Sequence, residues 1–283
     1  MYRLLGSVAC WKYDFLGLAR GLNMTDWLFN LPIFWMTLVV FGVTYLVGGG
    51  IYGLVTALAK GEQARAFKAI SSGMLPPLGI LFALFVAFVA AQVWTAIERA
   101  NAAVDREASA LRAVVVLAAA FPGEPESHLR ALIRRHIEQA ATQEWPMMAQ
   151  GTATLRFTPP LLAEALQLSL ALTPNTEGQK IAQREIATAL ETAFDARRQR
   201  IIISQSQVNS VKWLCLFVQA AAALFAIAMI HCDNRIASAI TVGLFATGVA
   251  ASVLLIASHD RPFTGKISVG PGPLLQVMPD TNR

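Results

Sequence analysis

Four long stretches of the 283-residue chain contain no Asp, Glu, Lys, Arg or His. A bilayer core of about 30 Å is crossed by about 20 helical residues, and these stretches approach or exceed that length. Only 14% of the residues are charged, whereas soluble domains average about 25%. A soluble protein would need a very large core to bury four such helices. The sequence therefore predicts four membrane-spanning helices, at residues 27–59, 74–97, 213–230 and 236–258.

The predicted fold is an all-α membrane protein with four transmembrane helices and a helical cytoplasmic domain between the second and third spans. Five parts are expected in chain order. They are an N-terminal interfacial segment, a first transmembrane pair, the cytoplasmic domain, a second transmembrane pair and a Pro/Gly-rich tail. Their bounds are 1–26, 27–97, 98–212, 213–258 and 259–283. The first span is long enough to tilt, or to bend near Gly48, Gly49 and Gly50.

Basic residues predict the orientation of the spans. An even number of spans places both termini and residues 98–212 on one side, which holds 19 of the 23 Lys and Arg residues. Basic residues gather on the cytoplasmic side of membrane proteins, and here they stand beside the spans at positions 99, 106, 197, 198, 200, 212, 261 and 266. Three spans end on that side in a tryptophan, as interfacial tryptophans do: Trp27, Trp94 and Trp213. The opposite loop weakly favours the reverse orientation through Lys60, Arg65 and Lys68.

The segment between the second and third spans has helical periodicity throughout. The second span is expected to continue as a helical rod until Pro122-Gly123 stops it. A further helix is expected from about Glu126 to Gln150, and a shorter one from a Thr158-Pro159 cap to just before Thr173-Pro174. The last helix, from about Gln179 to Lys212, is expected to run straight into the third span.

The sequence contains no catalytic or cofactor signature. No phosphate-loop, dinucleotide-binding, Gly-x-Ser-x-Gly or His-Glu-x-x-His pattern occurs. The three cysteines and four histidines lack metal-ligand spacing, and His128 and His136 are expected at solvated positions. Residues 98–212 contain 13 basic and 12 acidic residues, so a nucleic-acid surface is not expected. We therefore expect no enzyme activity, cofactor or metal.

Two rows of side chains within the spans are candidates for function. Ile80, Leu84 and Phe88 share one face of the second span, where apolar residues around an axis form a dewetting constriction; lipid contact or bundle packing is the alternative. The fourth span contains small residues four apart that permit close helix approach, within the hairpin or between subunits. They are Ala239, Gly243, Thr247 and Ala251.

Several blocks of sequence together resemble a known family. They are LPPLGILFALFVAFVAAQVW and ERANAAVDREASALRAV in and after the second span, EWPMM from Glu144, and HDRPFTGKISVGPGPL from His259. Their order and placement resemble the bestrophin-like bacterial membrane proteins, which are related to bestrophin anion channels. The resemblance covers about residues 70–275.

The resemblance implies a pentamer with four membrane helices per subunit, cytosolic termini and an apolar neck lined by the second span. Aligning Trp94 with the tryptophan that ends that span places Ile80 and Leu84 at neck positions, and Phe88 joins them by helical spacing. Gln92-Val93 departs from the family, which has a basic residue before the tryptophan. The acidic calcium cluster after the fourth span is reduced to Asp260.

The leading hypothesis is an oligomeric channel of the bacterial inner membrane that passes small anions through an axial apolar pore. Gln92, Trp94, Arg99 and Arg106 are its expected pore-mouth or interface residues. The expected partners are the lipid bilayer, further copies of the chain and small anions. The alternative is a non-conducting membrane scaffold whose helical domain recruits a cytosolic protein through residues 124–200. An enzyme acting on a lipid or a small molecule ranks third, because no site supports it.

Overall fold

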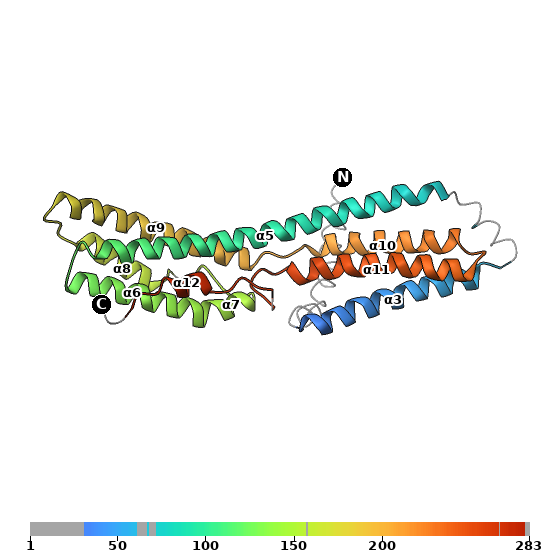
Figure 1. Cartoon of the computed structure of the whole chain (residues 1–283), viewed down its shortest axis with the longest axis horizontal. Helices are drawn as coiled ribbons and strands as arrows, with labels where there is room; N and C mark the ends of the chain where they lie inside the picture. The colour runs from blue at the N-terminus through green and yellow to red at the C-terminus, as the bar shows by residue number, and fades with distance from the viewer. Residues whose placement is uncertain (1–30, 61–66, 68–71, 157, 266, 281–283) are drawn as a thin grey trace, which may run out of the picture. The chain divides into compact units, whose positions relative to one another are not determined.

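The computed structural model describes residues 31–60, 67, 72–156, 158–265 and 267–280. Every regular element within these ranges is helical, which confirms the all-α prediction (Figure 1). The expected interfacial segment 1–26 lies outside the described residues, as do Arg65 and Lys68 of the first loop.

Among the described residues, four helices are long and apolar enough to cross a membrane. They are α3 (Ile33–Leu58), α5 (Leu75–Ala118), α10 (Ser210–Ile230) and α11 (Arg235–His259). Each of these helices coincides with one predicted span, although residues 27–30 of the first span lie outside the described residues. Helix α3 continues without interruption through its three consecutive glycines. Helix α5 follows a short 3₁₀ turn, η1 (Ser72–Met74), and runs well beyond the charge-free window, as the predicted rod requires.

The chain forms two compact units. The first, here called the membrane unit, groups α3, the first part of α5 up to Val93, α10 and α11. The second, called the helical unit, contains the rest of α5 and all the remaining helices named below.

Within the membrane unit, α3 packs against α10 and α11 through small side chains. A Cβ atom added at Gly48 would lie 3.5 Å from the Cβ of Ala246 and 3.6 Å from a methyl group of Val242. One turn away, the hydroxyl groups of Tyr45 and Thr247 are hydrogen-bonded at 2.8 Å. A single methyl group at Gly48 would thus be in ordinary van der Waals contact with α11, whereas a longer side chain would overpack this contact.

Helices α10 and α11 form the predicted hairpin, and both of its ends are fixed by side-chain caps. At the turn, Asn234 Oδ1 accepts hydrogen bonds from the backbone N–H groups of Ile236 and Ala237, both at 3.1 Å. At the open end, the buried carboxylate of Asp260 accepts a 2.6 Å hydrogen bond from the N–H of Val208. The Asp260 carboxylate thus gives the buried N–H of Val208 the partner that it needs. Asn234 caps the first turn of α11.

The helical unit is built on a heptad seam in α5. One row of its buried positions alternates four and three residues apart: Ala100, Val104, Glu107, Leu111, Val114 and Ala118. This spacing keeps one face of a helix against its partners. The same core includes buried residues of six further elements: α6 (Glu124–Gln139), the π-helical turn η2 (Ala140–Glu144), α7 (Trp145–Ala149), α8 (Pro160–Ala171), α9 (Glu177–Ser204) and α12 (Gly272–Gln276).

Two sequence predictions about helix ends are wrong. Helix α9 does not run into the third span, because the chain leaves the helix at Ser204 and restarts at Ser210. Asn209 caps α10 by accepting a hydrogen bond from the backbone N–H of Val211. The polar residues between Ser204 and Ser210 therefore separate two helices. Helix α8 begins at Pro160 with Pro159 as the capping residue, and Thr158 makes no side-chain cap.

We predict that Gly48→Leu destabilises the membrane unit, because the added side chain would enter the contact with Ala246 and Val242. Overpacking costs about 1–3 kcal/mol. Gly49→Leu is the matched control, since no atom lies within 4 Å of a Cβ built there. The measurement is the thermal unfolding midpoint of the purified protein in detergent. Equal midpoints for the two variants would contradict this packing.

Candidate functional site

The membrane part of α5 has one packed face and one exposed face. Phe82 and Val89 are buried, and the Phe82 ring lies 5.7 Å from that of Phe245 on α11. Ile80, Leu84 and Phe88, here called the apolar stripe, are 66%, 49% and 67% exposed in the single chain. The stripe therefore takes no part in the core of its own subunit, and it is available to lipid or to other copies.

The four expected mouth or interface residues all lie on α5, in different surroundings. Gln92 and Arg99 are exposed, and Trp94 is 54% exposed. Arg106 is exposed and donates a 3.3 Å hydrogen bond to Gln199 on α9. Gln92 accepts a hydrogen bond from the ammonium group of Lys212, the third residue of α10. The sequence did not indicate that Lys212 would reach this position.

The small-residue row of the fourth span does not form the close contact within the bundle. Ala239, Thr247 and Ala251 are exposed, and a Cβ added at Gly243 would have no neighbour within 4 Å. Close approach occurs instead at Gly48, beside Val242 and Ala246 of α11, and Thr247 of the row reaches α3 through its hydrogen bond to Tyr45. The row has two predicted roles, close helix approach within the hairpin and close helix approach between subunits. The second of these stays a prediction.

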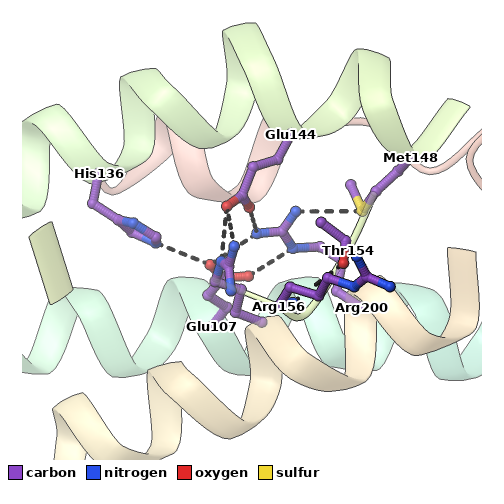
Figure 2. A network of polar contacts seen from close by, with 8 residues as sticks. Glu107, His136, Glu144, Met148, Thr154, Arg156 and Arg200 are labelled. Atoms are coloured by element: carbon purple, nitrogen blue, oxygen red, sulfur yellow. Dashed lines mark hydrogen bonds and ion pairs between the residues drawn. The ribbon is translucent and has the colours of Figure 1, made fainter. Parts of the chain in front are cut away.

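The helical unit contains a buried ion-pair network that the sequence analysis missed (Figure 2). Glu107 from α5 and Arg200 from α9 are both fully buried. Arg200 donates from Nε to one Glu107 oxygen at 2.8 Å and from Nη2 to the other at 3.1 Å. Such a two-pronged contact is the strongest arrangement that an arginine and a carboxylate can form.

Glu144, at the end of the π-helical turn, extends the network. It accepts from Arg200 at 2.9 Å and from Arg197 at 2.8 and 2.6 Å. His136 on α6 lies with its Nε2 atom 3.2 Å from Glu107, and the Arg200 guanidinium stacks 4.4 Å from the centre of the Trp145 ring. The negative charges of two carboxylates are thus matched by the positive charges of two guanidinium groups.

The network holds both carboxylates ionised. Glu107 lies beyond the charge-free part of α5, which ends at Ile97. Burial alone would raise the pKa of Glu107, but the charge of Arg200 and hydrogen bonds from His136 and Arg200 lower it from 4.5 to about 2. The pKa of Glu144 is also lowered, because Arg200 and Arg197 outweigh the effect of burial. The same carboxylates outweigh burial at Arg200 and raise its pKa.

Several residues of the network had been interpreted differently from sequence. His136 was expected in solvent and is buried, whereas His128 is exposed as expected. The orientation prediction counts Arg197 and Arg200 among the basic residues beside the spans, but both are buried and paired, and such arginines carry little information on topology. One feature of the sequence indicates the network: Glu107 is a charged residue within the apolar heptad row of α5, and a charge at such a position requires a buried partner.

The arrangement favours a structural role over a chemical one. Each carboxylate accepts hydrogen bonds from guanidinium groups, so neither is free to act as a base. Within the described ranges, no group of three or more His, Cys, Asp or Glu residues is placed to hold a metal ion. The exposed apolar stripe is thus the strongest candidate for function.

Comparisons with known proteins agree with this architecture. A family model described as the bestrophin-like domain matches residues 34–274. Two crystal structures of a bacterial bestrophin homologue from Klebsiella pneumoniae, each of a single-residue mutant, have a similar fold. The TM-scores are 0.64 and 0.63 at 12% identity, covering 86% of this chain and 97% or 96% of the other. Among curated proteins none matches.

We predict that Glu107→Gln strongly destabilises the helical unit. It leaves Arg200 buried with part of its charge uncompensated, and breaking a buried pair costs roughly 3–5 kcal/mol. The control is Glu177→Gln, because the Glu177–Lys180 pair is exposed and such pairs contribute at most about 1 kcal/mol. Urea unfolding of the full-length protein in detergent measures both. Glu107→Leu combined with Arg200→Met should recover much of the loss; equal effects of Glu107→Gln and its control would contradict this prediction.

The lowered pKa of Glu107 predicts acid sensitivity. Because the folded-state pKa is about 2 against 4.5 for an ordinary glutamate, the stabilisation is complete above about pH 4.5 and is lost as pH falls toward 2. The difference in unfolding midpoint between the wild type and Glu107→Gln should therefore shrink over this range. A difference that stays constant from pH 5 to pH 2.5 would contradict it.

Proposed function

We propose that this chain, which belongs to the bestrophin-like family, assembles with copies of itself into a channel that passes small anions across the membrane. The observation that carries the proposal is the apolar stripe on α5, which lies in a predicted membrane span and is exposed in the single chain, so it is available to line an axis between copies. No catalytic turnover is part of this function.

A ring of subunits gives the stripe a role that a single chain does not. Closed rotational symmetry is the usual arrangement of homo-oligomers, and each copy would place Ile80, Leu84 and Phe88 around one axis. Apolar side chains at a narrow axis repel water, so they form a gate that opens when the constriction widens. Resemblance to bestrophins favours five subunits.

Selectivity for anions is proposed to come from basic groups near the ends of the pore. Arg99 and Arg106 follow the stripe on α5 and are exposed in the single chain. Positive side chains at a pore mouth raise the local concentration of anions. We further propose that the protein lies in the bacterial inner membrane, with both termini in the cytoplasm.

A non-conducting scaffold is the second candidate, and one observation favours it. Leu170 on α8 and Ile181 on α9 are each 64% exposed, within the segment 124–200 expected to recruit a partner. Contiguous patches of exposed apolar side chains are typical of interaction surfaces, so the scaffold requires these two side chains to belong to one patch. The scaffold predicts a monomer or dimer in detergent and no ion flux.

Conduction and assembly are tested together with the purified protein. Light scattering in detergent should give the molecular mass of an oligomer, with five subunits favoured. Proteoliposomes should pass chloride above the background of empty vesicles. Ile80→Ala with Leu84→Ala should raise the flux several-fold, because smaller side chains weaken the dewetting barrier.

The matched control is Ile240→Ala with Leu244→Ala, two exposed residues at the same spacing on α11. This pair should leave the flux unchanged. Absence of chloride flux, or equal flux from the two double variants, would refute the proposed pore.

A further inference from the structure

We propose that the ammonium group of Lys212 is the anion-attracting group at the end of the apolar stripe, drawing small soluble anions to the pore. This inference rests on the proposed function, because it requires the stripe to border water. It assigns the attraction to a residue of α10, outside the helix that carries the stripe.

The position of Lys212 follows from the spacing of residues on α5. Ile80, Leu84, Phe88 and Gln92 are each four apart, so each is the neighbour of the next, about 6 Å further along the helix. Gln92 is exposed like the stripe, and its Oε1 accepts a hydrogen bond from Lys212 Nζ. A positive charge from another helix thus lies on the position that continues the apolar row.

The charge of Lys212 is not explained by the stability of its own helix. Lys212 stands in the first turn of α10, where the helix dipole disfavours a cation, and this turn contains no acidic residue. Its partner Gln92 is a neutral amide. None of the ion pairs among the described residues includes Lys212, so this contact leaves its charge uncancelled.

Lys212 belongs to the same compact unit as the stripe, and the two arginines expected at the pore mouth do not. Lys212 and Gln92 belong to the membrane unit, as the stripe does, whereas Arg99 and Arg106 belong to the helical unit. In a ring, each copy adds one such ammonium group at the same height. Rings of basic side chains next to a narrow apolar segment favour anions over cations.

The first experiment measures the local potential without requiring conduction. Phe88→Cys, in a full-length protein whose three native cysteines are serine, is treated with anionic sulfonatoethyl and cationic trimethylammonioethyl methanethiosulfonate. Lys212→Gln should lower the ratio of anionic to cationic reaction rates by about threefold or more at low salt, because charges this close are screened only at high salt. Lys212→Arg should preserve the ratio.

Two controls make the first experiment specific. Arg235→Gln removes an exposed basic residue from the opposite end of the hairpin and should not change the ratio. Leu244→Cys, as exposed as Phe88 but on α11, should show no response to Lys212→Gln. An unchanged ratio at Phe88→Cys would overturn the inference. If the cysteine reacts with neither reagent, the stripe faces lipid, Lys212 binds a lipid phosphate, and the inference fails.

The second experiment measures selectivity in proteoliposomes. Lys212→Gln should lower the chloride-to-sodium permeability ratio by about threefold or more in dilute salt, and less in 1 M salt, where the Debye length is about 3 Å. Unchanged selectivity in a conducting protein would overturn the inference and leave the pore intact. A protein that passes no chloride but shows the expected change in reaction rates would refute the channel and support the charge at the stripe.

Discussion

The contact between Arg200 and Glu107 determines how the helical unit is assembled. Both side chains are fully buried, so neither charge is stable without the other. A buried guanidinium has donors in fixed directions, so it binds carboxylates in only a few positions. Here the two carboxylates come from α5 and from the π-helical turn. The network therefore joins α5, α9 and the segment around Glu144 at one register, in addition to the apolar contacts of the core that they share.

Helix α5 serves two environments with two different patterns. Up to Ile97 it contains no charge, and its exposed side chains suit either lipid or an apolar pore. Beyond that point it follows a heptad seam with one charge inside it at Glu107. A single uninterrupted helix thus presents the apolar stripe in one unit and an ion-pair partner in the other.

Sequence reasoning succeeded where a pattern was long and failed where a single residue decided the outcome. Charge-free windows located the four spans because bilayer thickness fixes their length. The break before α10 depends on Asn209 and on Asp260, a residue distant in sequence that accepts from Val208. The Lys212–Gln92 contact joins residues of two helices, and no local pattern indicates it.

The π-helical turn changes which face of its helix points inward. Trp145 donates its backbone N–H to Ala140, five residues earlier, where an α-helix would use the residue four earlier. One additional residue in a turn rotates all later side chains by about 100° around the helix axis. Trp145 and Met148 therefore lie buried, with Ala140, at a spacing that a helical wheel of residues 124–149 would assign to different sides. An alignment of this segment by helical phase alone would be shifted by one residue after Glu144.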